Sequence, residues 1–420
     1  MSAAVATSIG NVALGKPASQ SSLSNWSSGN TVEADASIAT NGDTASPRFF
    51  HTNSEAAPWW QVDLRTCFVI EQVRIFNRRD LTERLRRLTV LVSQTGAPGS
   101  WLAICRKDDD AEFGRGNDIP LVLTPDIRSL ARFVRIRKDN PGFLHFRECE
   151  VLGYAPEADA LACLREQTER ARQRQADEQA AIEHELGAGR TGYVARIGAH
   201  AVFVDTDNYS PTLVGALTDG GYESRERSVM HAIIRPTDRI LEIGTAVGVV
   251  TMTLAAIVGP ANVITYDANP AMVADARRNF AANRMGGIRA DVGVLRNRGR
   301  WSARESEIDF FVSRDFWASR LVAAPDSPDI TGVVKVPLVC LESRIAEHRA
   351  NVLVCDIEGG EADLLDGADL GPIRLVMLEI HYWAVGRQRI DDMIRFMMSR
   401  GFTIDFTHSG HGIVVLDRAP

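Results

Sequence analysis

The sequence lacks the features that mark several specialised classes of protein. Its 420 residues include only six cysteines, at positions 67, 105, 149, 163, 340 and 355. They form neither a CxxC pair nor a Cys/His spacing typical of zinc sites, and they are too sparse for a disulfide framework. No apolar run reaches the ~18 residues needed to cross a bilayer. The first residues show no basic segment ahead of a long apolar core, so we expect no secretory signal. These absences predict a soluble, reduced, cytoplasmic protein without a transmembrane segment.

The chain also lacks an excess of positive charge. It contains 47 Lys and Arg against 54 Asp and Glu, a net charge of −7. A general nucleic-acid binder usually carries a basic surplus, so we expect no nucleic-acid partner. Hydrophobic residues make up 45% and charged residues 24% of the chain, which excludes a mainly disordered protein. At about 100–200 residues per domain, the length predicts two to four domains.

Residues 1–155 show the pattern of an antiparallel β-sandwich. Runs rich in Val, Ile and Phe alternate with stretches rich in Ser, Gly and Asn. The runs are RIFNR (74–78), LTVLVS (88–93), RFVRIR (132–137) and ECEVLGY (148–154). Residues 88–93 place Leu88, Val90 and Val92 on one face, and this period of two predicts a half-buried strand.

Residues 156–188 are predicted to form a connecting helix. The segment 157–186 contains no Gly or Pro and is rich in good helix formers, with Pro156 at its start and Gly187 at its end. Its apolar stripe is thin, so most of its surface must be solvated. The helix could also mediate self-association.

Residues 189–420 alternate strand and helix, which predicts a doubly wound α/β domain of the Rossmann-like type. The strands are RILEIG (239–244), NVITYDANP (262–270), NVLVC (351–355), RLVMLEIH (374–381) and GIVVLD (412–417). Helical segments lie between them, among them 249–258, 270–284 and 390–401.

The first of these strands ends in a glycine-containing turn. Gly244 allows a tight turn and a close approach of the backbone to a ligand, and Gly248 lets the next helix begin close to the strand. The spacing is GxxxG and differs from the GxGxxG of dinucleotide binders. The next strand ends at Asp267, which could accept hydrogen bonds from both ribose hydroxyls of a nucleoside or could cap the following helix. Together these features predict a nucleoside-type cofactor.

Four motifs in residues ~200–420 resemble the FkbM-like branch of S-adenosylmethionine-dependent methyltransferases. They are LEIGTAVG (241–248), YDANP (266–270), CDIEGGEADLLDG (355–367) and VMLEIH (376–381). The resemblance implies that S-adenosyl-L-methionine is the cofactor. It places Glu242, Gly244, Thr245, Gly248 and Asp267 around the cofactor, with Tyr222 and Glu223 covering it from the preceding segment. Ala246 stands where the family usually has a second glycine.

Methylation of a hydroxyl also requires removal of its proton as attack proceeds. The candidates are Asp356 and Glu358 at one strand end, and Glu379 and His381 at the end of its expected neighbour. Because residues i and i+2 of a strand share a face, we expect Asp356 to pair with Glu358 and Glu379 with His381. His381 is the first choice for the general base, because its ordinary pKa is near ~6.5, and Glu358 is the second.

Other interpretations of these residues stay open. His381 could be a hydrogen-bonded His at a strand end, and Glu361 could be an acid in the first turn of a helix. The carboxylates could instead hold a divalent cation.

Residues ~10–154 resemble discoidin-type (coagulation-factor C-type) β-sandwich lectins, most closely the fucolectin group. The resemblance is carried by NVALGKPASQSS (11–22), FFHT (49–52), PWWQVDL (58–64), FNRRD (76–80), ERL (83–85) and ECEVLGY (148–154). It implies a jelly-roll, galactose-binding-like sandwich that binds carbohydrate through His51, Arg78 and Arg84. It also implies a calcium ion near Asn41, Asp43 and Glu148. Alternatively, the arginines form a solvated basic rim or a site for an anionic glycan or phosphate, and Asn41-Gly-Asp43 is an ordinary turn.

The combination predicts an S-adenosylmethionine-dependent O-methyltransferase that acts on a saccharide or glycoconjugate, with the lectin-like module raising the effective concentration of the glycan. One alternative is a carbohydrate-binding adaptor whose methyltransferase domain is degenerate. Another is a methyltransferase for a lipid, a peptide or a small metabolite, with its acceptor pocket lined by residues 296–337. The aromatic residues of that segment, Trp301, Phe310, Phe311, Phe316 and Trp317, either stack on a ligand ring or cover the sheet.

Overall fold

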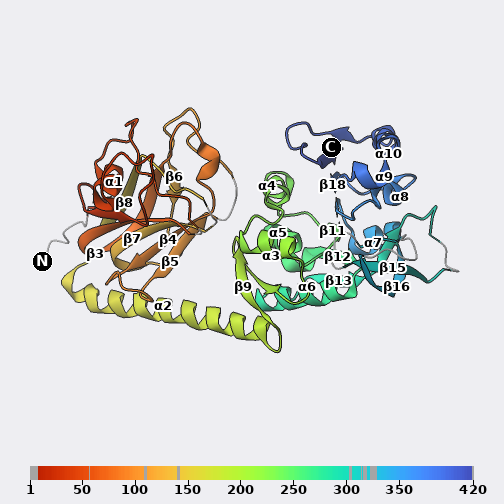
Figure 1. The fold of residues 1–420 in the computed structure, drawn as a ribbon, viewed down its shortest axis with the longest axis horizontal. Helices are drawn as coiled ribbons and strands as arrows, with labels where there is room; N and C mark the ends of the chain where they lie inside the picture. The colour runs from red at the N-terminus through yellow and green to blue at the C-terminus, as the bar shows by residue number, and fades with distance from the viewer. Residues whose placement is uncertain are drawn as a thin grey trace, which may run out of the picture. The chain divides into compact units, whose positions relative to one another are not determined.

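The computed structural model describes residues 8–55, 57–107, 111–139, 142–301, 305–313, 315, 319–321 and 329–418. Phe316 and Trp317, two of the candidate acceptor-pocket aromatics, lie outside the described residues. The chain divides into two compact units, Met1–Ala181 and Ile182–Pro420, and the division falls inside the long helix α2 (Ala158–Gly187) (Figure 1). Among the residues that the structure describes, no helix combines the length and the apolar character needed to cross a membrane.

The N-terminal unit is an antiparallel β-sandwich built around β3 (Trp59–Phe76), as predicted. β3 pairs with four other strands, and its register shifts within its 18 residues, against β7 and against β8. The core of the N-terminal unit contains the buried rings of Phe50, Trp60 and Phe146, and Phe146 lies edge-on to Phe50 at a centroid distance of 4.5 Å. The other elements are β1 (Gly10–Asn11), β2 (Ala18–Gln20), α1 (Val32–Ala36), η1 (Ser37–Thr40), η2 (Thr82–Arg84), β4 (Leu88–Ser93), β5 (Leu102–Lys107), β6 (Leu121–Leu123), β7 (Leu130–Lys138) and β8 (Glu148–Tyr154).

The prediction that residues 88–93 form a half-buried strand is wrong. All six residues of β4 are buried, because the polar side chains of its second face find partners inside the unit. The Thr89 hydroxyl donates to Asp139, and the hydroxyls of Ser93 and Ser100 lie 2.7 Å apart. Satisfied hydrogen bonds allow polar side chains to be buried at little cost.

The first part of α2 docks on the sandwich through hydrogen bonds from polar side chains to strand backbones. The Gln175 amide accepts from the Ala103 N–H and donates to the Ala103 carbonyl, both at 3.0 Å. The Thr168 hydroxyl accepts from the Leu130 N–H at 2.9 Å. These contacts compensate for the thin apolar stripe of the helix.

The second unit contains a seven-stranded sheet with helices on both faces, which confirms the doubly wound α/β fold (Figure 1). Its strand order is β13-β12-β11-β17-β18-β20-β19, with β20 antiparallel to both of its neighbours and the remaining pairs parallel. The strands are β11 (Ile240–Ile243), β12 (Val263–Asp267), β13 (Arg289–Val292), β17 (Val352–Cys355), β18 (Leu375–Glu379), β19 (Thr403–Ile404) and β20 (Ile413–Asp417).

Alternate residues of the strands pack into two separate hydrophobic cores, one on each face of the sheet. Ile240 packs with α3 (Pro211–Thr218), α4 (Ser224–Ile233), α5 (Val249–Val258) and α6 (Pro270–Ala282). Leu241 packs with α7 (Leu341–His348), α8 (Glu361–Leu365) and α10 (Arg387–Ser399). This alternation directs Glu242, one residue further, to the side of α4 and α5.

The remaining strands lie outside the large sheet. β9 (Gly192–Ile197) and β10 (His200–Asp205) form a hairpin. β14 (Val294–Arg296), β15 (Glu307–Ser313) and β16 (Ile330–Cys340) form a small sheet from the segment predicted to line an acceptor pocket. Of the aromatic residues in that segment, Phe310 is buried, whereas Trp301 is partly exposed. The short elements η3 (Pro260–Asn262) and α9 (Tyr382–Val385) complete the unit.

Candidate functional sites

The strand order of the large sheet reverses at β11, because β12 lies on one side of it and β17 on the other. In open α/β sheets, ligands bind at the carboxyl ends of the strands at such a switch point. The turn after β11 joins both neighbours: the Gly244 N–H donates to the Tyr266 carbonyl at 2.8 Å, and the Asp356 N–H donates to the Ile243 carbonyl at 2.9 Å. The two strand ends are therefore held together where a ligand is expected.

Both predicted glycines of the turn are required by packing. Gly244 has φ +103°, and a Cβ there would lie 1.8 Å from the Asp356 carbonyl oxygen. The backbone that comes close to Gly244 is thus that of the neighbouring strand end. Gly248 has φ +85° and precedes α5, and a Cβ there would meet the Phe280 ring at 2.5 Å. Ala246 also adopts a left-handed conformation, with φ +44°, a region that favours glycine.

Asp267 supports this turn from the end of β12. Its Oδ2 accepts from the Ala246 N–H at 2.8 Å, and its Oδ1 accepts from the Asn269 N–H at 2.7 Å. The carboxylate therefore links the turn after β11 to the start of α6. The cap of α6 is Asn269, whose side chain accepts from the Ala271 N–H. The Thr245 side chain is buried, and its hydroxyl lies 2.6 Å from that of Thr265.

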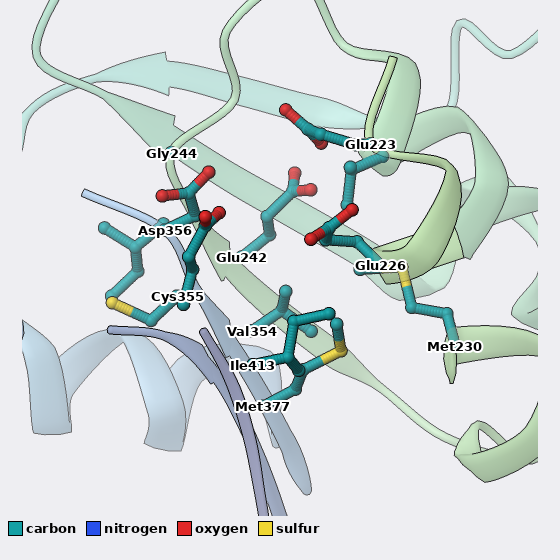
Figure 2. A pocket seen from close by; sticks show the side chains of 13 residues that line it. Glu223, Glu226, Met230, Glu242, Gly244, Val354, Cys355, Asp356, Met377 and Ile413 are labelled. Carbon is teal, nitrogen blue, oxygen red and sulfur yellow. The ribbon is translucent and has the colours of Figure 1, made fainter. Parts of the chain in front are cut away.

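A pocket at this switch point is strongly acidic. Figure 2 shows carboxylates directed into a common space above an apolar floor of Val354, Met377 and Ile413. The acidic lining residues are Glu223, Glu226, Glu242, Asp356 and Glu379, and the described lining includes no basic side chain. Such a cavity favours a positively charged ligand.

Burial raises the pKa of several acids of this pocket. Burial raises the pKa of Glu242 to about 7 and that of Glu223 to about 8. Burial, and then the charges of neighbouring carboxylates, raise the pKa of Asp356 well above its usual range. The Glu242 Oε2 accepts from the Thr251 hydroxyl at 2.5 Å, whereas its buried Oε1 has no hydrogen-bond partner among the described residues. This oxygen is free to accept from a ligand.

The predicted catalytic residues lie next to this pocket. His381 Nδ1 lies 2.7 Å from Glu361 Oε1, and His381 Nε2 lies 3.0 Å from Glu358 Oε2. Glu361 is fully buried and also accepts from the Gly359 N–H at 3.0 Å. Burial lowers the pKa of His381, but the Glu361 hydrogen bond and the surrounding carboxylates outweigh it, so the pKa is raised above 6.5. Glu361 lies in the first turn of α8, as one interpretation expected, and its contact with His381 also orients the imidazole ring.

The expected pairing along strand faces is confirmed only for Glu379 and His381, whose side chains lie 3.9 Å apart. Glu358 instead contacts His381, and no contact of Glu358 with Asp356 is seen among the described residues. β17 ends at Cys355 and β18 at Glu379, so Asp356, Glu358 and His381 lie beyond the strands, where alternation no longer applies. Glu358 has φ +51°, in the left-handed region. This conformation directs its side chain to His381 of the neighbouring strand end.

The same cluster also has the spacing of a cation site. Asp356, Glu379 and His381 each offer one ligand atom, and these atoms lie within 4.8 Å of one another. A mixed set of carboxylates and imidazole suits several divalent metals. The alternative of a divalent cation therefore stays open.

In the sandwich, the structure brings His51, Arg78 and Arg84 together. The Arg78 guanidinium lies 4.0 Å from the centroid of the Phe49 ring and pairs with Asp80, and the Arg84 guanidinium lies 5.4 Å from the centroid of the Phe143 ring. The His51 ring is stacked on His145 at 5.3 Å, and its Nδ1 lies 2.7 Å from the Thr52 carbonyl.

Both imidazoles of this cluster are neutral at pH 7. Burial, together with the charges of Arg78 and Arg84, lowers the pKa of His51, although the Thr52 hydrogen bond opposes the shift. The same effects lower the pKa of the buried His145 to about 3. A neutral imidazole offers one donor and one acceptor, and an arginine offers a fork of donors, a combination that suits sugar hydroxyls.

Comparisons with known proteins assign both units. Residues 38–136 match the family model of the NedA-like, galactose-binding domain, and residues 242–404 match that of the methyltransferase FkbM domain. The second unit contains an FkbM methyltransferase domain. Both resemblances found in the sequence are thereby confirmed. No curated protein matches the chain.

Solved structures to which this chain is similar include a lectin domain, a fucolectin and a fucose-binding module. The lectin domain of lectinolysin, complexed with Lewis B antigen, is 27% identical, covers 35% of this chain and 98% of its own, and has a TM-score of 0.28. A fucolectin from striped bass (Morone saxatilis) serum is 24% identical over 36% of this chain and 51% of its own, with a TM-score of 0.32. A fucose-binding module of Streptococcus pneumoniae is 23% identical over 34% of this chain and 94% of its own, with a TM-score of 0.27.

The residues predicted to bind calcium in the galactose-binding domain fit a hard cation. Glu148 is fully buried, its Oε2 accepts from the Gly42 N–H at 3.2 Å, and its Oε1 has no hydrogen-bond partner in the described part of the chain. Asn41 and Asp43 form the adjoining turn, in which Asn41 Oδ1 accepts from the Asp43 N–H at 2.7 Å. A buried carboxylate oxygen without a donor is stabilised by a cation, and calcium prefers oxygen ligands.

Sequence reasoning missed four contributors to the two sites. In the FkbM domain these are Glu226, one helical turn after Glu223 on α4, and the orienting role of Glu361. Glu226 could have been found from the sequence, because it lies three residues after Glu223 and such residues share one face of a helix. In the galactose-binding domain they are His145 and Phe143, whose contact with His51 joins loops about 90 residues apart and leaves no local signal.

Proposed function

We propose that this protein is an S-adenosylmethionine-dependent O-methyltransferase that acts on a hydroxyl group of a saccharide or glycoconjugate. The observation that carries the proposal is the acidic pocket at the switch point of the FkbM domain, which adjoins the Glu358–His381–Glu361 cluster. The galactose-binding domain in the same chain supports the saccharide as the acceptor.

The residues at the switch point fit the cofactor. S-adenosylmethionine supplies an electrophilic methyl group on a positively charged sulfonium. Gly244 lines the same pocket as Glu242, and the unpaired Oε1 of Glu242 is suited to the methionine portion of the cofactor. Asp267 is suited to its ribose, and Tyr222 and Glu223 lie in the segment that leads into α4, near Asp267 and Asp356.

The cluster beyond β17 and β18 is suited to receive the proton of the acceptor hydroxyl. Glu361 accepts the Nδ1–H of His381 and fixes the orientation of the ring. His381 Nε2 and the partly exposed Glu358 then face the side on which an acceptor can enter. Methyl transfer is an in-line displacement, so positioning of the hydroxyl supplies much of the acceleration.

The galactose-binding domain would raise the effective concentration of the glycan, because both domains belong to one chain. His51, Arg78 and Arg84 would bind sugar hydroxyls, and a calcium ion at Glu148 would brace the neighbouring loop.

Mass spectrometry of glycans incubated with the full chain and methyl-labelled S-adenosylmethionine tests the proposal. We expect a labelled methyl ether on at least one glycan, and its loss in the H381A variant. The proposal fails if no glycan is methylated although S-adenosylhomocysteine binds. Binding of glycans without binding of S-adenosylhomocysteine would instead indicate a carbohydrate-binding adaptor.

A further inference from the structure

An exposed aromatic pair borders the proposed catalytic cluster. α9 follows His381 directly, and in it Trp383 is 75% exposed and Tyr382 51% exposed. The Trp383 ring stands edge-on to the His381 imidazole at a centroid distance of 6.1 Å. An exposed Trp has a large apolar surface, and such a surface beside a reactive group suggests contact with a ligand.

The backbone of α9 is fixed relative to the catalytic residues. The N–H groups of Ala384 and Val385 donate to the His381 carbonyl at 3.0 and 3.1 Å. On the other side, a Cβ at Gly359 would lie 2.7 Å from the Ala384 Cβ, so the helix packs against the turn that follows Glu358. The element that carries Trp383 is therefore held between the two residues proposed to receive the proton.

The chemistry around Trp383 favours one class of ligand. Glu358, Glu379 and Asp356 are each about one-third exposed at this cluster. A cluster of carboxyl groups favours a ligand with many hydroxyl groups and disfavours anions and long alkyl chains. A pyranose ring has such hydroxyls at its edge and a C–H face that can lie flat on an indole.

We propose that Trp383 is the stacking platform of the acceptor site, which packs against the apolar face of a pyranose ring and presents one ring hydroxyl to Glu358 and His381. This inference rests on the proposed function and specifies its substrate class. Trp383 is a positioning residue, because it holds the sugar and does not exchange a proton. Tyr382 borders the same platform.

The test compares variants of the full chain with a fixed set of acceptors. The pyranosides are the methyl glycosides of galactose, fucose, glucose, mannose and N-acetylglucosamine, and the other acceptors are a serine peptide, a catechol and a hydroxy fatty acid. The variants are W383A, W383F as the conservative change, and M398A as a matched control on the half-exposed Met398 of α10. Methyl transfer is followed by mass spectrometry, and binding of S-adenosylhomocysteine by calorimetry.

We expect transfer to at least one pyranoside. W383A should raise the KM for it about tenfold or more while changing kcat less than about threefold. W383F should keep most of the affinity, and M398A should be unchanged. Binding of S-adenosylhomocysteine should be the same in all variants. A KM unaffected by W383A, or transfer confined to the other acceptors, overturns the platform but not the methyltransferase. Absence of S-adenosylhomocysteine binding by the unmodified chain overturns the proposed function itself.

Discussion

Replacing Gly244 by alanine should strongly disturb the proposed cofactor site of the FkbM domain. The new Cβ would lie 1.8 Å from the Asp356 carbonyl oxygen, whereas real Cβ atoms do not come within 3.0 Å of another atom. The ends of β11 and β17 must therefore separate by at least about 1 Å. Alanine would also have to adopt φ +103°, which L-residues rarely do.

The two effects together set the expected magnitude. Overpacking of a tight contact costs about 1–3 kcal/mol, and a left-handed alanine costs about 1–2 kcal/mol. We therefore expect G244A to destabilise the FkbM domain by about 2–5 kcal/mol. Because the displaced atoms surround the pocket, affinity for S-adenosylhomocysteine should fall at least about tenfold.

Calorimetry with S-adenosylhomocysteine and urea unfolding of the full chain measure the two effects. G215A is the matched control, because a Cβ at Gly215 in α3 meets no atom within 4 Å. That variant should bind normally and unfold at the same or a slightly higher urea concentration. Unchanged affinity and stability in G244A would refute the contact between the two strand ends.

Three further predictions concern charge. E361Q removes the negative charge beside His381, so the pKa of His381 should fall. The rate of methyl transfer should then rise at a lower pH than in the unmodified chain. An unchanged dependence of the rate on pH would contradict the orienting role of Glu361. R84A should weaken glycan binding about tenfold, and R84K should recover only part of the affinity, because lysine lacks the planar guanidinium fork. R115A changes an exposed arginine and serves as the control. Equal glycan affinities of R84A and the unmodified chain would contradict the proposed sugar site of the sandwich. Burial raises the pKa of Glu148 from its ordinary 4.5 to about 7, so without calcium the sandwich should lose stability as the pH rises between these values. Calcium should then raise the unfolding temperature more at pH 8 than at pH 5 and should have no effect on E148Q, and an equal effect at both pH values contradicts the site.

Local signals were sufficient to predict much of the fold. The helix predicted at 249–258 has those bounds in the structure, because Gly248 precedes it and Gly259 ends it, both with positive φ. The strand predicted at 148–154 likewise has its predicted bounds. Glycine and the change of period from 2 to 3.6 are properties of a few neighbouring residues, so one sequence reveals them.

Contacts between distant segments could not be predicted in this way. The burial of Thr89 depends on Asp139, which is 50 residues away. The bond between His381 and Glu361 depends on where two adjacent strands end, and the interaction of Glu358 with His381 depends on a left-handed backbone that glutamate rarely adopts. The motif residues were therefore found from the sequence, whereas their partners required the three-dimensional arrangement.

A crystal structure of the full chain soaked with S-adenosylhomocysteine tests the central claim most directly. We predict that the ligand crosses the carboxyl ends of β11 and β12, with its amino group near Glu242 and its ribose hydroxyls within hydrogen-bond reach of Asp267. Density for the ligand at another place, or an unaltered acidic pocket at saturating ligand concentration, would contradict the assignment of this pocket to the cofactor.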